Sequence, residues 1–222
     1  PAARVFDADE IAALARVCVR HDLIAISDEV WEHVVFDGRP HLGLLAAPGM
    51  AERTIKIGSA GKMFGLTGWK VGFACGAPAL IAPLARAHQF LTFSTPPNLQ
   101  TAVAAGLGWE ASWFEAMRAD LGRSRDRLTD ALGAQGYVVT PSEGTYFLCV
   151  DLAASGVVLD DVAFCRRIVT EFGVAAIPLS AFQASPVTRP GTRNVARLCF
   201  AKADAVLDRA AERLGRARRA LI

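Results

Sequence analysis

The stretch TIKIGSAGKMFGLTGWKVGFAC, residues 54–75, decides the fold class because it joins two apolar segments through a glycine-rich loop. Its first part, residues 54–58, is a short apolar run bounded by glycine, which is typical of a buried strand. Two lysines and several glycines follow, and residues 71–75 form a second strand-like run. A buried strand that leads into a polar loop is typical of a layered α/β domain, where ligands gather beyond the carboxyl ends of the strands.

The alternation of helix and strand continues on both sides of this stretch. Upstream, Asp7 is a suitable N-cap for a helix that ends near residue 21, and residues 23–27 form another buried-strand pattern. Downstream, we expect helices at about 78–91 and 97–106. Residues 1–107 are therefore predicted to form an α/β domain.

The character of the sequence changes after residue 107. A long helix with a polar face is expected over about 109–135, and strands and helices in mixed order follow it. The expected strands are 137–140, 145–150, 174–177 and 194–201, and the expected helices are 160–172 and 203–221. Residues 108–222 are thus predicted to form a smaller α+β domain that begins with the long connecting helix.

Composition limits the possible partners and compartment. The chain has 222 residues, of which 52% are hydrophobic, and a net charge of +2 with scattered basic residues, so we expect an ordered core and no nucleic-acid partner. The five cysteines form no Cys-x-x-Cys pair, and the sequence contains no signal-peptide pattern and no apolar run of bilayer length. We therefore predict a cytoplasmic protein without membrane partners. The histidines lack metal-ligand spacing, so no metal is predicted.

Lysine is rare in this chain and concentrated in one place. Twenty of the 24 basic residues are arginines, and three of the four lysines, Lys56, Lys62 and Lys70, lie within fifteen residues of each other. Lysine differs from arginine in offering an amine that can act as a nucleophile. Asp28 and Lys62 follow predicted strands, and Ser59 and Lys70 add a hydroxyl and a cation that suit a phosphate. These residues indicate an anionic cofactor and an amine nucleophile, although a solvated lysine and a helix-capping aspartate are the ordinary alternatives.

Five short motifs resemble those of one enzyme family. SAGK at residues 59–62 and GWKVG at 68–72 resemble the cofactor segment of class I/II pyridoxal-phosphate-dependent aminotransferases of fold type I. DEVW at 28–31 resembles their Asp-Glu-Val-Tyr motif, and EGTYF at 143–147 and RLCF at 197–200 resemble their small-domain motifs. Within the family, the pattern is most similar to the kynurenine–glutamine and methionine aminotransferase branch.

The resemblance implies a reaction and a role for each matched residue. The reaction is transfer of an amino group from an L-amino acid to a 2-oxo acid with pyridoxal 5'-phosphate, in a homodimer. Lys62 would form a Schiff base with the cofactor and move the substrate's Cα proton. Asp28 would keep the pyridine nitrogen protonated, and Ser59 and Lys70 would hold the phosphate. Arg197 would grip the substrate α-carboxylate.

Trp31 departs from the family pattern. Tyrosine is usual at this position, where its hydroxyl bonds the ring oxygen of the cofactor, whereas an indole N–H donates from a different point. Trp31 therefore either contacts the cofactor directly or packs in the wall of the site. Phe93, Phe182 and the Trp109–Trp113 region hint at an apolar or aromatic-tolerant substrate pocket, but packing is the ordinary role of such residues.

The resemblance also predicts which part of the enzyme the chain represents. Residues 1–107 would be the C-terminal part of the large, mostly parallel-sheet domain, and residues 108–222 the small domain. Pro1 corresponds to the proline of the family's Asn-Pro turn, so we expect an N-terminally incomplete chain that is inactive alone. Two alternatives stay open: a cysteine-conjugate β-lyase that uses the same cofactor, and the aminotransferase-like sensing domain of a transcriptional regulator.

Overall fold

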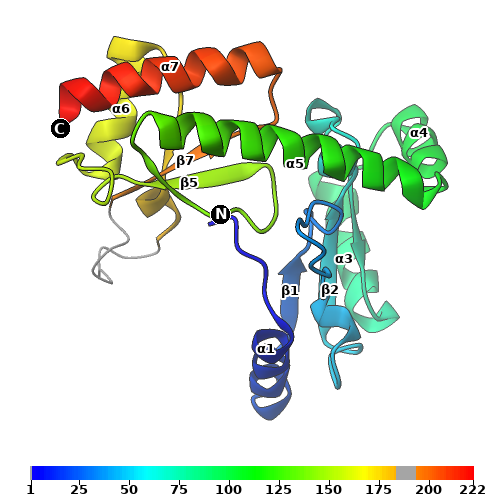
Figure 1. The fold of residues 1–222 in the computed structure, drawn as a ribbon. Helices are drawn as coiled ribbons and strands as arrows, with labels where there is room; N and C mark the ends of the chain where they lie inside the picture. Colours follow the sequence, from blue (N-terminus) through cyan, green and yellow to red (C-terminus); the bar gives the residue numbers. More distant parts are fainter. Residues whose placement is uncertain (1, 184–193) are drawn as a thin grey trace. The chain divides into compact units, whose positions relative to one another are not determined.

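A computed structural model describes residues 2–183 and 194–222, which form two compact units (Figure 1). One unit comprises Val5–Glu115, and the other comprises the residues up to Arg4 together with Ala116–Ile222. The division falls inside helix α5 (Ala111–Ala134), a few residues beyond the boundary that the sequence suggests. The assignment of residues 1–107 and 108–222 to parts of a large and a small domain stays a prediction.

The Val5–Glu115 unit is built on a three-stranded sheet of order β1-β2-β3. Strand β1 (Ala25–Asp28) pairs in parallel with β2 (Thr54–Ser59), and β2 pairs antiparallel with β3 (Gly72–Cys75). The unit also contains helices α1 (Ala8–Arg20), α2 (Ala60–Met63), α3 (Pro78–Leu91) and α4 (Pro97–Leu107), and 3₁₀ turns η1 (Leu44–Ala46) and η2 (Thr67–Trp69).

Helix α1 begins where the sequence predicts because Asp7 forms a capping box. The Asp7 carboxylate accepts a hydrogen bond from the Glu10 N–H at 2.9 Å, and the Glu10 carboxylate accepts one from the Asp7 N–H at 3.0 Å. The apolar side of the helix packs through Ala15 against Leu44 and Met50. This small core connects α1 to the loop that follows β1.

Strand β2 carries a buried hydroxyl at its beginning. Thr54 is fully buried, and within the described residues its Oγ1 has no hydrogen-bond partner. A buried polar group without a partner costs about 1–3 kcal/mol of stability, because it loses its hydrogen bond to water and gains none in return.

We therefore expect Thr54→Val to raise the free energy of unfolding by about 1 kcal/mol, since valine keeps the branched shape and removes the hydroxyl. Chemical denaturation of the natural protein that contains this chain measures the change. Thr54→Ser is the matched control. It keeps the hydroxyl and loses a buried methyl group, so it should lower stability by about 1 kcal/mol. A loss of stability in the valine variant would show that the hydroxyl is satisfied.

The second unit contains a four-stranded antiparallel sheet of order β4-β5-β7-β6. Helices α6 and α7 and the later part of α5 complete it (Figure 1). The strands are β4 (Val138–Thr140), β5 (Phe147–Asp151), β6 (Ile177–Pro178) and β7 (Val195–Cys199), the helices are α6 (Asp161–Phe172) and α7 (Asp204–Leu221), and η3 (Leu179–Phe182) is a 3₁₀ turn.

The two central strands of this sheet, β5 and β7, pair so that residues opposite each other point to the same face, and successive pairs point to alternate faces. Leu148 on β5 lies opposite Leu198 on β7, and both are buried. Leu198 lines a small void together with residues of all three helices, including Phe164 and Leu214. The next pair, Cys149 opposite Arg197, points to the other face because side chains alternate along a strand. The hydrophobic core thus fixes the direction in which Arg197 projects.

Some strands are shorter than their sequence patterns predict. Strand β5 begins at Phe147 rather than 145, because Thr145 has a left-handed φ of 69° and its hydroxyl accepts a hydrogen bond from the Phe147 N–H at 3.1 Å. The pattern at 174–177 yields only the two-residue strand β6, and the one at 194–201 yields Val195–Cys199. Local turns therefore replace pairing at the strand ends.

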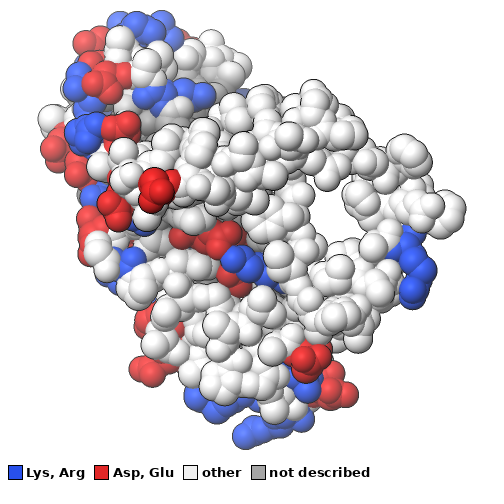
Figure 2. All heavy atoms as spheres, turned by 90° about the vertical axis from the view of Figure 1, so that its right-hand side faces the viewer, with Lys and Arg blue, Asp and Glu red and all other residues white. Residues whose placement is uncertain are grey.

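The surface near α3 is apolar. Phe90, Leu91 and Phe93 are 87%, 82% and 81% exposed, respectively. Figure 2 shows the side on which α3 and α4 lie in Figure 1, and a broad area of that side carries few charged side chains. In the described part of the chain, no helix has the length and apolar character needed to cross a membrane.

Candidate functional site

Two of the predicted site residues lie at the ends of neighbouring strands. Asp28 is the last residue of β1, and Ser59 is the last residue of β2. Because β1 and β2 run in parallel, with Asp28 opposite Ile57, both side chains lie at the same edge of the sheet. The Asp28 side chain is exposed, whereas Ser59 is half-buried. This edge is where an α/β sheet usually binds a ligand.

Lys62 lies on the short helix α2, which starts directly at the end of β2. The sequence pattern predicts a loop here, but Ser59 caps a helical turn: its Oγ accepts a hydrogen bond from the Lys62 N–H at 3.3 Å. Thr67 closes the segment by donating its hydroxyl hydrogen to the Gly61 carbonyl at 3.3 Å. A Cβ added at Gly61 would lie 3.0 Å from the Thr67 Cα, so the close approach of these two backbones favours glycine.

The Lys62 amine lies near Trp31. Its Nζ is 5.4 Å from the centre of the Trp31 ring, within the range of a cation–π contact. Trp31 belongs to the loop that follows β1, and Lys62 follows β2, so the two strands bring the two side chains together. The structure thereby relates the DEVW and SAGK motifs, which are separated by more than twenty residues in the sequence.

Lys70 adopts a backbone conformation that is uncommon for residues other than glycine. It ends the turn η2 with φ 57° and ψ 36°, in the left-handed region, and its side chain is exposed. This conformation costs about 1–2 kcal/mol for a residue with a Cβ. Such strain is found most often at binding sites, where a particular side chain is needed despite the cost.

Glu29 carries a buried carboxylate that the sequence does not single out as special. Its side chain is 6% exposed and receives hydrogen bonds from Ser27, His41 and the Leu44 N–H. Burial raises the pKa of the Glu29 carboxyl, but these hydrogen bonds and the charge interaction with His41 together lower it more, so its pKa lies below the ordinary value. Glu29 is therefore ionised at neutral pH. The partners His41 and Leu44 are distant in sequence, and no spacing pattern identifies them.

An aromatic cluster packs around Phe64, the residue that directly follows α2. Phe64, two residues after Lys62, lies 5.6 Å from Trp109 and 5.4 Å from Trp113, measured between ring centres. Phe114 adds a further contact at 5.9 Å and stacks on His33 at 4.4 Å. Trp109 and Trp113 thus pack against the segment that carries Lys62.

Arg197 lies in the other unit, close to two phenylalanine rings. The centre of its guanidinium is 4.0 Å from the Phe147 ring centre and 4.5 Å from that of Phe182. Its Nε is buried and lacks a hydrogen-bond partner within the described residues. Burial lowers the pKa of the Arg197 guanidinium from its usual value, a shift partly opposed by Cys149, Cys199 and Tyr146. Arginine nevertheless stays protonated in proteins.

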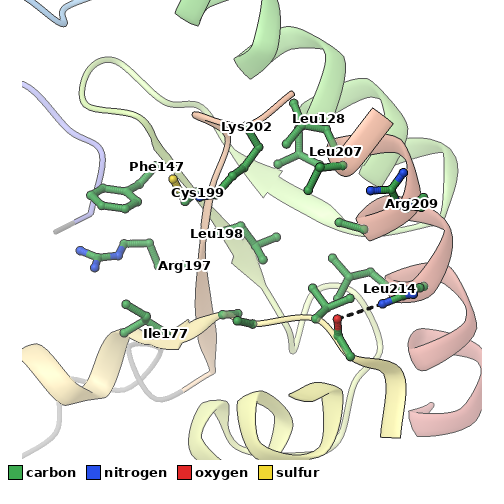
Figure 3. Close-up of a pocket in the computed structure, with 17 residues that line it drawn as sticks. Leu128, Phe147, Ile177, Arg197, Leu198, Cys199, Lys202, Leu207, Arg209 and Leu214 are labelled. Carbon is green, nitrogen blue, oxygen red and sulfur yellow. Dashed lines mark hydrogen bonds between the residues drawn. The ribbon is translucent and has the colours of Figure 1, made fainter. Parts of the chain in front are cut away.

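A cavity of about 560 Å³ lies beside β7 in the same unit (Figure 3). Figure 3 shows Leu198 and Arg197 pointing to opposite sides of the strand, with α7 on the side of Leu198. Among the described residues, the lining is largely aliphatic and includes no carboxylate. Its cations include Lys202, Arg209 and Arg213, the last of which donates a hydrogen bond to the Gly173 carbonyl at 3.1 Å.

The predicted site residues divide between the two units. Asp28, Trp31, Ser59, Lys62 and Lys70 belong to the Val5–Glu115 unit, and Arg197 to the other. Their individual roles stay predictions. Within residues 2–183 and 194–222, no group of three or more histidine, cysteine or acidic side chains is arranged to hold a metal ion.

Comparison with known proteins gives a consistent result. The family model for aminotransferase class I and II matches residues 1–214. The chain is 44% identical to a probable N-succinyldiaminopimelate aminotransferase of Mycobacterium tuberculosis, over 96% of this chain and 55% of that protein. It is 43% identical to the methionine aminotransferase of Escherichia coli, over 96% of this chain and 54% of that protein. It thus spans about half the length of the curated relatives it matches.

Comparison with a solved structure leads to the same family. The N-succinyldiaminopimelate aminotransferase from Mycobacterium tuberculosis superimposes with a TM-score of 0.92 at 44% identity, covering 98% of this chain and 56% of the other. The resemblance and the α/β fold class predicted from the sequence motifs are confirmed. The chain therefore belongs to the class I and II aminotransferase family, whose members have the fold-type I architecture and use pyridoxal phosphate.

Proposed function

We propose that the natural protein containing this chain transfers an amino group from an L-amino acid to a 2-oxo acid, with pyridoxal 5'-phosphate bound covalently to Lys62. One observation carries this proposal. Lys62 follows β2 at the sheet edge that also holds Asp28, with its amine 5.4 Å from the Trp31 ring, in a chain that matches the aminotransferase family model over residues 1–214.

The chemistry of the side chains at this edge fits the cofactor. When bound, pyridoxal phosphate withdraws the electrons left at the substrate Cα after proton removal. The exposed Asp28 carboxylate is suited to pair with a protonated pyridine nitrogen. Ser59 accepts the Lys62 N–H through its oxygen, which leaves its own hydrogen to donate to a phosphate oxygen. Lys70 would add a cation for the same phosphate.

Two side chains would act on the substrate. The free Lys62 amine would take the proton from the substrate Cα and deliver it to C4′ of the cofactor. Arg197, whose guanidinium lies close to the Phe147 and Phe182 rings, would bind the α-carboxylate through its N–H groups. A fixed carboxylate would orient the Cα–H bond for removal.

The substrate class and the assembly belong to the same proposal. The relatives are named for different amino acids, among them N-succinyldiaminopimelate and methionine, so the proposal extends to an L-amino acid donor and a 2-oxo acid acceptor without choosing the side chain. We further propose a homodimer. The exposed apolar residues Phe90, Leu91 and Phe93 support a partner surface near α3. The free cysteines support a reducing, cytoplasmic setting.

The test uses the natural protein, purified without cofactor and titrated with pyridoxal 5'-phosphate. We expect a saturable visible absorbance band from the covalently bound cofactor, and loss of that band when an L-amino acid is added, with recovery after a 2-oxo acid. Product analysis by mass spectrometry should show the new amino acid in equal amount to the 2-oxo acid consumed. A protein that binds no pyridoxal phosphate, or that releases ammonia instead of transferring the amino group, would overturn the proposal.

A further inference from the structure

Lys56 is the lysine of the Lys56–Lys70 cluster that the proposed reaction leaves without a role. It lies in the middle of β2, opposite Ser27 on β1. Its Nζ contacts the Glu32 carboxylate and lies 4.0 Å from Oε2 of Glu29. One ammonium group on β2 therefore connects two acids of the loop that follows β1.

Glu29 is the centre of this group. Its Oε1 accepts hydrogen bonds from the Ser27 hydroxyl at 2.8 Å and the Leu44 N–H at 3.1 Å. Its Oε2 accepts one from Nε2 of His41 at 2.9 Å, because an ionised carboxylate only accepts. The three hydrogen-bond donors come from β1 and from two points in the loop, and the Lys56 ammonium on β2 adds an ion pair at 4.0 Å. They fix the carboxylate from several directions.

The two anchored acids bracket Trp31. The Glu32 N–H donates to the Glu29 carbonyl at 3.1 Å, and the Val34 N–H donates to the Trp31 carbonyl at 2.8 Å, so residues 29–34 form consecutive turns. The Glu29 N–H also continues the sheet by donating to the Ile57 carbonyl at 3.0 Å. Trp31 thus lies on a short segment that is tied to β2 at both ends.

We propose that the cluster of Glu29, Glu32 and Lys56 is a positioning device that holds the Trp31 indole against the cofactor bound at Lys62. The inference rests on the proposed function. Of the two alternatives for Trp31, the inference takes contact with the cofactor and not packing in the wall of the site. Glu29 and Lys56 are positioning residues that act through Trp31.

The chemistry of the cluster favours positioning over simple support of the fold. Removing a carboxylate and a partly buried ammonium from water carries a desolvation cost, and packed apolar side chains often stabilise a fold equally well. Directed hydrogen bonds differ from apolar contacts in fixing orientation, and a side chain that must meet a ligand needs its geometry held to within about 0.5 Å. Trp31 needs such support because its indole N–H donates in a single direction.

The test is the Glu29→Gln variant of the natural protein. With its NH₂ in place of Oε1, the amide would face the Ser27 hydroxyl and the Leu44 N–H. In place of Oε2, the NH₂ would face His41 and the Lys56 ammonium, which lies 4.0 Å from that position. The Trp31 turn should therefore loosen. We expect the Kd for pyridoxal 5'-phosphate to rise about tenfold or more, by analogy with residues that orient the ligands of a metal ion through hydrogen bonds. The Kd comes from absorbance and fluorescence titration, with the melting temperature measured in parallel.

Asp161→Asn is the matched control. Asp161 is also a buried carboxylate with two hydrogen bonds, from the Ser180 N–H at 2.8 Å and the Ser180 hydroxyl at 2.9 Å, but it lies in the other unit. The Asp161→Asn variant should have a lower melting temperature and an unchanged cofactor Kd. If Glu29→Gln fails to fold, Ser27→Ala removes only one donor of the cluster, and its Kd should still rise severalfold.

A double-mutant cycle with Trp31→Ala tests the route of the effect. If Glu29 acts through Trp31, adding Glu29→Gln to Trp31→Ala should change the cofactor Kd by less than about twofold, whereas independent effects would multiply. The inference is overturned if Glu29→Gln alone leaves the Kd unchanged or if the two effects multiply. Absence of cofactor binding in the wild-type protein would instead reject the proposed function, so the two failures are distinguishable.

Discussion

Lys62→Ala should abolish the absorbance band of the covalently bound cofactor and lower kcat/KM for transamination by about a thousandfold or more. The variant removes the amine that binds the cofactor and also the base that moves the Cα proton, and a positioned base alone contributes about 10²–10⁴-fold. The other two lysines of the cluster are poorly placed to substitute. Lys56 contacts Glu32 and lies close to Glu29, and Lys70 follows a separate turn eight residues later.

The control for this prediction is Lys202→Ala, the same change at a lysine of the other unit. It should keep both the absorbance band and the rate. Mass spectrometry after borohydride reduction would add an independent readout, because the reduced cofactor should stay attached to the peptide that contains Lys62. An unchanged band in Lys62→Ala, or attachment to a different lysine, would reject the assignment.

Local signals in the sequence predict much of the fold. The helix α1 begins at its capping residue Asp7, and α6 follows the N-cap Asp160, whose carboxylate accepts the Ala163 N–H at 2.7 Å. The apolar pattern in the sequence does not give the start of strand β1. The apolar pattern starts at Leu23, but the Leu23 N–H bonds the Cys18 carbonyl at the end of α1, so pairing with β2 begins only at Ala25. Hydropathy does not reveal this competition between helix end and strand.

In the candidate site, too, the sequence reveals motifs of neighbouring residues but not contacts between residues far apart in the chain. The motifs around Asp28 and Lys62 can be recognised because their residues are close in sequence and each follows a strand. The surroundings of Glu29 cannot, since His41 and Lys56 lie far along the chain and meet it only when β1 and β2 pair. Likewise, the contact of Arg197 with Phe182 depends on how β7 and η3 pack within their unit. Such pairings follow from tertiary structure and leave no spacing pattern.

Arg197→Met should raise the KM for both the amino acid and the 2-oxo acid by about a hundredfold. Methionine keeps an elongated side chain beside Phe147 and Phe182 but removes the charge and the hydrogen-bond donors. A charge-assisted hydrogen bond contributes about 1.5–3 kcal/mol, which corresponds to roughly 10- to 150-fold in affinity. Both substrates carry a carboxylate, so both should be affected. Steady-state kinetics at varied donor and acceptor concentrations measures the two KM values.

The surroundings of Arg197 predict more than the effect of losing a positive charge. The Arg197 guanidinium lies close to both the Phe147 and the Phe182 ring, and its Nε is buried without a partner in the described part of the chain, so a carboxylate is expected to bind the N–H groups at the end of the side chain. Arg197→Lys keeps the charge but lacks the planar fork, and its KM should lie between those of wild type and Arg197→Met. Arg123→Met, at an exposed position on α5, should leave KM unchanged. The cofactor Kd should stay constant in all three variants, because the predicted cofactor residues lie in the other unit. An Arg197→Met enzyme with normal KM values, or one that loses cofactor and substrate affinity together, would show that Arg197 supports the fold and does not bind the carboxylate.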